Sequence, residues 1–292
     1  MPPHPSDANP PAPNDGARAA GVASLAIREI LGGRRRDGRV IGLANETVFA
    51  EFPGAPGEPR VVAISTPATI RLPNAIITAA ISGARSGDPV HAGGGCVTVA
   101  GVTIRALRWW DPVPVVGPLS RARLDHGAAA LARVCVQSHP PGLAGHPGPA
   151  ALAACCASGD LVGAVEQAEA LVGLGPGIIP AGDGVLCGLL LALRLLGGAI
   201  PGGTRAVWLA GWLSAAVTAY ARERTIPLGA SLLHCAARGQ AVAEVASVLH
   251  GMAGEEPLEP TARKFLDATP WAADISWGLV AGCQAARVVS VS

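Results

Sequence analysis

The chain has 292 residues, of which 50% are hydrophobic and 15% are charged, and its formal net charge at pH 7 is +1. This length allows one large domain or two smaller domains with a sizeable core. The near-neutral charge argues against nucleic acid as a partner. The apolar stretches fall short of the roughly 20 residues that a membrane span needs, so we expect no membrane partner.

The seven cysteines form no Cys-x-x-Cys pair and match no zinc-site spacing. The first twenty residues hold no apolar segment of the kind found in signal peptides. Free thiols in a reducing compartment are the simplest interpretation. We therefore expect a cytoplasmic protein.

The N-terminal part of the chain is predicted to be rich in strands. Residues 1–20 are rich in proline and small polar residues, which predicts a disordered tail. Residues 21–31 suit either a short helix or a leading strand. The strands that follow are separated by turns at Asn45-Glu46 and Ala100-Gly101. We expect a β-rich domain over residues 21–118.

The remainder of the chain is predicted to be helical. Apolar residues recur there at helical spacing, which indicates a helical domain over residues 119–292. Two long apolar stretches, 184–200 and 206–221, are interpreted as buried helices because both are short for a membrane span. The other predicted helices cover residues 121–138, 150–172, 228–238, 240–253, 261–268 and 275–288. The predicted fold class is α+β, with a β-rich unit followed by a helical domain.

The most unusual segment is the loop GLGPGIIPAGDG at residues 173–184, which holds five glycines and two prolines before an apolar helix. Glycine permits positive φ and the close approach of a ligand, and a helix N-terminus favours an anion. The spacing matches neither the dinucleotide-binding nor the Walker A motif. The loop therefore predicts either an anion cradle or a tight packing turn. The cradle would be shaped by Gly173, Gly175, Gly177 and Gly182.

Four polar residues are candidates to complete this site. Asp183 at the start of the apolar helix could be a substrate or metal ligand, or a helix cap. Arg224 could clamp a carboxylate or phosphate with its forked donors, beside Thr225, or could be solvated charge at a helix C-terminus. Asp274 precedes the last helix and is either a ligand-orienting residue or a cap.

The glycine-rich segment resembles the signature of the AllH-type family, which runs Gly-Leu-Gly-Pro-Gly-Leu-Thr-Pro-Ser-Gly-Asp-Asp before an apolar helix. A second block, residues 224–233 (RTIPLGASLL), resembles the family's Arg-Thr-Thr…Ser…Leu-Leu segment. A third block, residues 268–274 (ATPWAAD), falls where the family has Gly-His-Ser-Ser-Gly-x-Asp before a last helix. Proteins of this family are linked to the oxamate carbamoyltransferase of anaerobic allantoin degradation, as one of its subunits.

The resemblance implies a carbamoyltransferase-like subunit in purine catabolism, which is a transferase function. It implies a small anionic substrate, carbamoyl phosphate-like or a carboxylate, held by the glycine loop, Arg224 and Thr225, with Asp183 and Asp274 orienting a polar group or ion. It implies other subunits of a carbamoyltransferase-type complex, or further copies of the chain, as partners. We expect no cofactor, and any divalent metal would lie near Asp183.

The departures from the family pattern remove polar groups and keep the glycines. The replaced hydroxyl and carboxylate positions are Ile179, Ala181, Gly184, Ile226 and Gly229. A lost hydrogen-bonding partner at a buried site costs about 1–3 kcal/mol, so we expect a divergent member that binds its ligand differently. The alternative is a non-catalytic structural or regulatory subunit, in which the loop is only a turn between two helices.

Overall fold

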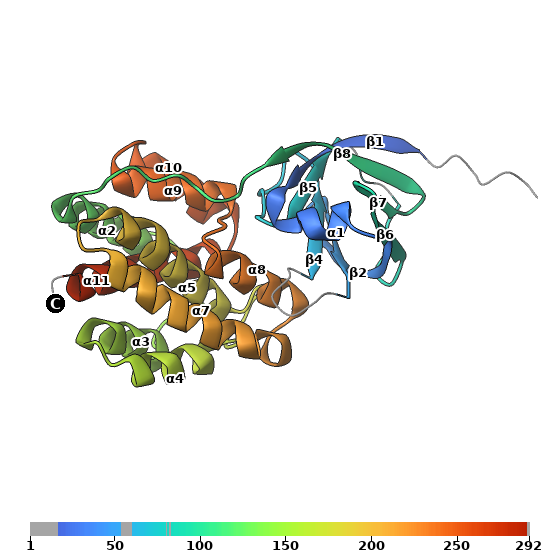
Figure 1. The fold of residues 1–292 in the computed structure, drawn as a ribbon. Helices are drawn as coiled ribbons and strands as arrows, with labels where there is room; N and C mark the ends of the chain where they lie inside the picture. Colours follow the sequence, from blue (N-terminus) through green and yellow to red (C-terminus); the bar gives the residue numbers. More distant parts are fainter. Residues whose placement is uncertain (1–16, 54–59, 80, 82, 291–292) are drawn as a thin grey trace, which may run out of the picture.

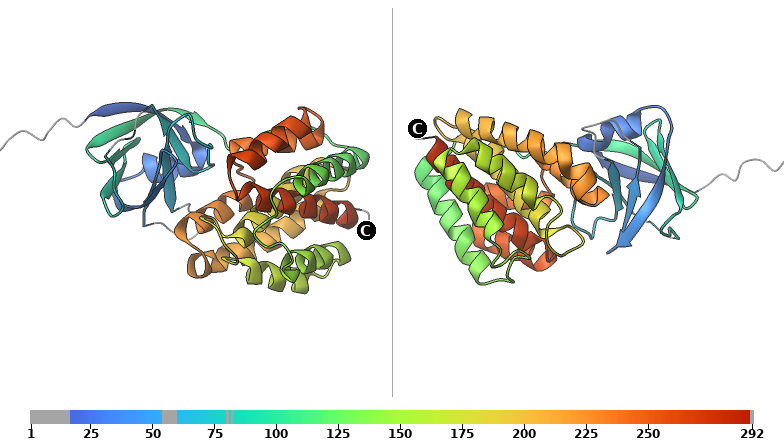
Figure 2. Two further views of the ribbon diagram at one scale, coloured as in Figure 1. Left: turned by 180° about the vertical axis from the view of Figure 1, so that it is seen from behind. Right: turned by 90° about the horizontal axis from the view of Figure 1, so that it is seen from below.

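The computed structural model describes residues 17–53, 60–79, 81 and 83–290. These residues form a closed β-barrel followed by a helical domain, with the barrel at one end of the helices (Figures 1 and 2). The α+β layout agrees with the prediction. The predicted tail at residues 1–16 lies outside the described residues, and Arg18–Ala20, which we assigned to the same tail, are instead part of the first strand.

The barrel has eight strands in the order β1-β5-β4-β3-β2-β6-β7-β8. Neighbouring strands are antiparallel except for the parallel pairs β1–β8 and β4–β5. The barrel encloses its own apolar core of mainly β-branched side chains, as half-buried strands require. The strands are β1 (Arg18–Ser24), β2 (Arg36–Ala44), β3 (Thr47–Glu51), β4 (Val61–Ser65), β5 (Ala75–Thr78), β6 (Pro89–Gly93), β7 (Cys96–Val99) and β8 (Val102–Trp110).

Both predicted turns are confirmed as hairpin turns. Asn45-Glu46 joins β2 to β3, with φ angles of 45° and 57°, and Ala100-Gly101 joins β7 to β8, with φ angles of 48° and 77°. Positive φ at both positions matches the twist of the flanking strands. Residues 21–31 contain the end of β1 and the beginning of the short helix α1 (Arg28–Gly32), so each of the two structures proposed for this segment is present in part.

The helical domain begins at Arg121, and its helices follow the predicted segments to within a few residues. Residues 150–172 form two helices that meet at Gly159, which has the left-handed conformation of a helix C-cap. The helices are α2 (Arg121–Val136), α3 (Pro147–Ser158), α4 (Leu161–Leu171), α5 (Ala181–Leu191), α6 (Gly197–Ala199), α7 (Thr204–Arg224), α8 (Pro227–Ala237), α9 (Ala243–Ala253), α10 (Leu258–Ala268) and α11 (Ala272–Val289), and a π-helical turn, Ala192–Leu196, joins α5 to α6.

Helix α5 is the centre of this domain, and each of its residues is buried. The continuous helix Ala181–Ala199 is long and apolar enough to cross a membrane by composition alone, but 83% of that apolar window is buried inside the molecule. It is therefore the core helix that the sequence predicted. It packs backbone to backbone on α11: a Cβ at Gly188 would lie 2.0 Å from the Ile275 carbonyl, and one at Gly278 would lie 2.1 Å from the Val185 carbonyl.

Hydrogen bonds join the barrel to the helices. The Ser231 hydroxyl on α8 accepts from the backbone amides of Arg60 (3.1 Å) and Val61 (3.0 Å) at the start of β4. The Ala243 amide at the start of α9 donates to the Arg71 carbonyl at 3.1 Å. Ser231 is 1% exposed, so this junction is buried. The two domains are thus fixed against each other along one side, and a cavity lies between them.

Candidate functional site

The glycine-rich loop links α4 to α5, and its glycines adopt conformations that other residues would resist. Gly173, Gly175 and Gly177 have φ angles of 74°, 89° and 115°, which lie in the region that favours glycine. Gly182 is helical, but a Cβ there would lie 2.0 Å from the Leu171 carbonyl oxygen. The four predicted glycines therefore shape the loop and its close approach to the preceding helix.

The loop caps the N-terminus of α5 with its own carbonyl groups. The Ala181 amide donates to the Pro176 carbonyl at 3.2 Å, and the Gly182 amide donates to the Leu174 carbonyl at 2.8 Å. The first amides of a helix normally lack intrahelical partners. Here two of them have partners inside the loop, as the packing-turn interpretation requires.

Asp183 joins three segments of the helical domain. Its side chain is fully buried. One carboxylate oxygen accepts from the Gly173 amide at 2.8 Å, and the other accepts from the Thr225 hydroxyl. Burial raises the pKa of this carboxyl, and the hydrogen bonds from Thr225 and Gly173 oppose that rise. The cap of α5 is Pro180, so the helix-cap interpretation of Asp183 was wrong, and its contacts lie outside its own helix.

One departure from the family pattern is explained by this carboxylate. A Cβ at Gly229 would lie 2.3 Å from the Asp183 Oδ2 and 2.7 Å from the Thr225 Oγ1. A serine at this position, as in the family pattern, would displace one of the two side chains. The glycine therefore permits the Asp183–Thr225 hydrogen bond.

Arg224 lies at the surface, where α7 passes α4. Its guanidinium donates to the Glu169 carbonyl at 2.9 Å and lies 5.0 Å from the centre of the Tyr220 ring. Such a position combines a hydrogen bond at the end of a helix with a cation–π contact. The predicted pair is thus divided, because Thr225 faces inward to Asp183 while Arg224 faces outward.

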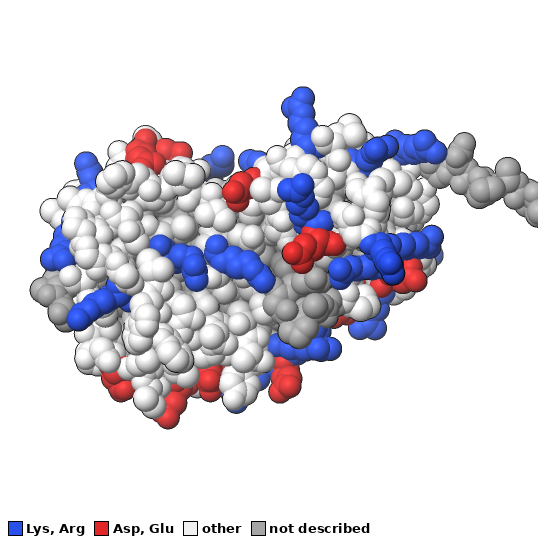
Figure 3. Space-filling view, viewed as in Figure 1, with Lys and Arg blue, Asp and Glu red and all other residues white. Residues whose placement is uncertain are grey.

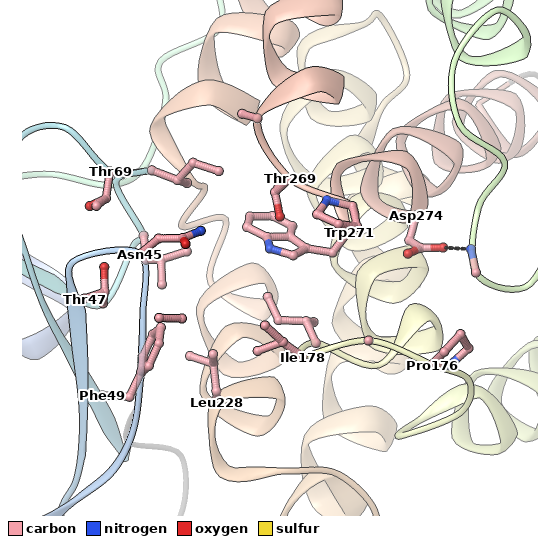
Figure 4. A pocket seen from close by; sticks show the side chains of 18 of the residues that line it. Asn45, Thr47, Phe49, Thr69, Pro176, Ile178, Leu228, Thr269, Trp271 and Asp274 are labelled. Carbon is pink, nitrogen blue, oxygen red and sulfur yellow. Dashed lines mark hydrogen bonds between the residues drawn. The ribbon is translucent and has the colours of Figure 1, made fainter. Parts of the chain in front are cut away.

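A cavity of about 910 Å³ lies between the barrel and the helical domain (Figure 4). Its barrel side comes from the β2–β3 hairpin and the segment after β4, and its helical side comes from the glycine loop and the start of α11. The residues named in Figure 4 are Asn45, Thr47, Phe49, Thr69, Pro176, Ile178, Leu228, Thr269, Trp271 and Asp274. Gly177 and Asp274 are the predicted site residues in its lining; Gly173, Gly175, Gly182, Asp183, Arg224 and Thr225 lie outside it.

Asp274 is the buried acid of this cavity. It is 4% exposed, and one carboxylate oxygen accepts from the Gly142 amide at 2.8 Å. In Figure 4 the other oxygen lies on the side of Trp271. Burial raises the pKa of Asp274 to about 6, against the opposing effect of the Gly142 hydrogen bond. Helix α11 has Trp271 as its cap, so the helix-cap interpretation was wrong for Asp274 as well.

Gly184 gives Asp274 the space that it occupies. A Cβ at Gly184 would lie 2.7 Å from the Asp274 Cβ. The family pattern has an aspartate where this chain has Gly184, and two carboxylates this close would repel each other. The change to glycine thus leaves a single acid, Asp274, on this side of the cavity.

Three backbone amides in the outer part of the loop have no acceptor among the described residues. The amides of Gly177, Ile178 and Ile179 donate no hydrogen bond to any residue that the structure describes, and the three residues line the cavity. The lining contains two acids, Glu46 and Asp274, and no lysine or arginine among the described residues. A ligand anion here would therefore depend on backbone amides.

Sequence reasoning missed the barrel side of the cavity, and it missed Trp271 on the helical side. Asn45 was identified only as a turn residue, and Thr69 and Trp271 were not singled out, although Trp271 stands within the third block of the family resemblance. The positive φ of Asn45 holds it at the tip of the hairpin. No sequence signal showed that this tip faces the helical domain.

Comparison with known proteins gives one match, and it lies in the helical domain. Residues 171–283 match the family model described as oxamate carbamoyltransferase subunit AllH. This match supports an AllH-type assignment for the segment that it covers. The match begins at the last residue of α4, includes the glycine loop and α7, and ends within α11, so it covers less than half of the chain and none of the barrel. No curated protein and no solved structure matches the chain.

The AllH-type match supports the relation to oxamate carbamoyltransferase that the resemblance implied, and the word subunit implies a multi-subunit complex. Groups of three or more histidine, cysteine, aspartate or glutamate side chains that could hold a metal ion are not found among the described residues. A metal near Asp183 and a role in allantoin degradation stay predictions.

Proposed function

We propose that this AllH-type chain is the ligand-binding subunit of a carbamoyltransferase-type complex, and that its ligand occupies the cavity between the barrel and the helices. The ligand class is a small molecule that carries both a carboxylate or similar anion and an N–H-bearing carbamoyl or amide group. The observation that carries this proposal is the pairing of three unused loop amides with one buried carboxylate across a single cavity.

Each half of such a ligand would find its chemical complement. Backbone amides stabilise an anionic oxygen without a nearby cation, and the amides at residues 177–179 are available for this. The free oxygen of Asp274 would accept from the ligand's N–H group, because an ionised carboxylate is a hydrogen-bond acceptor only. Oxamate, which joins a carboxylate to a carboxamide, carries both groups.

This assignment places the ligand on the outer face of the loop, away from Asp183. Catalysis at such a site would consist mainly of positioning and charge stabilisation. The alternative is a structural subunit with a degenerate site. It is favoured by the internal capping of α5, where the Ala181 and Gly182 amides already donate to loop carbonyls.

Thermal unfolding with oxamate, carbamoyl phosphate or inorganic phosphate at millimolar concentration tests the proposal. A ligand that binds only the folded state raises the Tm with increasing concentration. We expect oxamate and carbamoyl phosphate to raise the Tm of the wild type, and phosphate, which has no N–H group, to raise it less.

Two matched substitutions complete this experiment. Asp274→Asn should abolish the shift with oxamate, whereas Asp125→Asn, at an exposed acid on α2, should leave it unchanged. No shift with any of the three compounds would favour the structural alternative. A full shift in Asp274→Asn would show that the ligand binds elsewhere.

A further inference from the structure

Helix α7 exposes an unusual aromatic and apolar face. It runs along the outside of the helical domain (Figures 1 and 2), and the surface around it is largely uncharged (Figure 3). Trp208 and Trp212 are 55% and 51% exposed, and their rings meet edge to face with centroids 6.0 Å apart. Large exposed aromatic side chains that are rimmed by charges mark protein interaction sites.

The exposed residues of this face follow one stripe of the helix. Between Arg205 and Arg222 the sequence has no charged residue. At 100° per residue the stripe occupies about a third of the helix circumference. We define the α7 face as the exposed residues Thr204, Arg205, Trp208, Gly211, Trp212, Ala215, Ala219, Arg222 and Glu223.

The face is self-complementary when it is turned end for end. Arg205 lies nine residues before Ser214 and Glu223 lies nine residues after it, which places them roughly 27 Å apart along the helix. In an antiparallel pair of α7 helices centred at the level of Ser214, each Arg205 would lie opposite the Glu223 of the other chain. Neither side chain has a hydrogen bond or ion pair within the described residues.

The shape of the α7 face also suits an antiparallel pair of α7 helices. Gly211, Ala215 and Ala219 leave a shallow groove, and a Cβ at Gly211 would meet no atom within 4 Å. Small residues let two helix backbones approach closely, and the tryptophans of one helix can then cover the groove of the other. A pocket of about 560 Å³ beside Trp208, lined also by Leu161 and Leu209, lies at the end where the C-terminal part of the second α7 would arrive.

We propose that the occupant of the α7 face is a second copy of this chain, paired antiparallel through α7. The symmetric placement of Arg205 and Glu223 about the middle of an uncharged stripe supports a copy over an unrelated partner, since a twofold interface places the same patch on both subunits. This proposal is independent of the ligand cavity, because none of the described residues that line the cavity belongs to α7.

The mass of the purified chain in solution, measured by light scattering and sedimentation, tests the proposal. We expect twice the chain mass of 29.2 kDa for the wild type at micromolar concentration. Ala215→Arg should raise the dissociation constant at least about tenfold, because the arginine would fill the groove. Ala129→Arg, at an exposed alanine on α2, is the matched control and should leave the dimer intact.

Reversing the charges of Arg205 and Glu223 tests whether these two residues pair between the two chains of the dimer. Glu223→Arg alone should weaken the dimer, because it places like charges opposite each other. The double variant Arg205→Glu with Glu223→Arg should restore the wild-type dissociation constant. Circular dichroism checks that each variant is folded.

A monomeric wild type overturns the proposal. So does a dimer that Ala215→Arg and Ala129→Arg affect equally, or one that the double charge reversal fails to restore. Binding of a different subunit to α7, with the isolated chain monomeric, would assign the face to that subunit instead.

Discussion

The inner end of the glycine loop and the cavity at its outer end both bury an aspartate, but they treat it differently. Asp183 is fully buried and both of its oxygens accept hydrogen bonds, from Gly173 and Thr225. Asp274 is also buried, yet one described donor reaches it, the Gly142 amide, and its second oxygen borders a cavity. Burial is common to both aspartates, so it does not distinguish them; the unused hydrogen-bonding capacity of Asp274 is what makes it the candidate for ligand binding.

The family pattern gains a physical meaning from the same comparison. At the inner end, Gly229 leaves room for Asp183 and Thr225 to meet. At the outer end, Gly184 leaves room for Asp274. Gly229 stands where the resembled pattern has a serine and Gly184 where it has an aspartate, so each substitution gives space to the one carboxylate that remains at its site. The inner carboxylate then serves stability, and the outer one is available for binding.

The largest expected effect is a difference in stability between the alanine variants of the two aspartates. Asp183→Ala should lower the free energy of unfolding by about 3 kcal/mol, because it leaves the half-buried Gly173 amide and Thr225 hydroxyl without their acceptor. Asp274→Ala should cost about 1 kcal/mol, because it leaves one amide unpaired and also removes a buried carboxylate. Urea unfolding measures both values. Equal losses in the two variants would remove the distinction between a structural and an available carboxylate.

The next effect is the pH dependence that Asp274 confers. Burial raises its pKa from 3.8 to about 6, so the folded state binds more protons than the unfolded state between these values. The contribution of Asp274 to stability therefore falls as the pH rises from about 4 to about 6 and is constant above that range. Relative to Asp274→Asn, the wild type should lose on the order of 2 kcal/mol over this interval.

Urea unfolding of both proteins at several pH values between 4 and 7 measures this difference, and Asp125→Asn is the control for a general effect of the substitution. A difference that stays constant with pH would mean that water in the cavity solvates the Asp274 carboxylate fully. In that case the two aspartates would differ more in solvation than their burial in the structure indicates.

The sequence predicted the parts of the fold that depend on local patterns. The apolar run that contains Arg194 was interpreted as a buried helix because it is short for a membrane span, and the Asn45-Glu46 turn was predicted from its place between two strand-like segments. Closure of the barrel could not be predicted, since it depends on pairing Arg18 with Thr103 in parallel, and no local signal specifies a contact between such distant residues.

The candidate site was less predictable for the same reason. Asp183 and Asp274 look alike in the sequence, because each is an acid at or next to the predicted start of an apolar helix, and both lie in the first turn of their helix in the structure. Their difference arises from Thr225 and Gly142, which come from other segments of the chain. The cavity also needs the β2–β3 hairpin to meet the start of α11, and that meeting is a consequence of how the two domains pack.

The smallest expected effect is the loss of one side-chain hydrogen bond, either beside Asp183 or at the wall of the cavity. Thr225→Val keeps the shape of the side chain and removes the hydroxyl that donates to Asp183. It should lower the free energy of unfolding by about 1 kcal/mol, because Asp183 then has a buried oxygen without a donor. Thr69→Val is the matched control at the cavity, where the hydroxyl donates only to the Thr66 carbonyl, and its cost should be below about 0.5 kcal/mol. Thermal and urea unfolding give both values. If Thr69→Val cost as much as Thr225→Val, the cavity wall would be as tightly hydrogen-bonded as the inner end of the loop, and the space beside Asp274 would be part of the folded core.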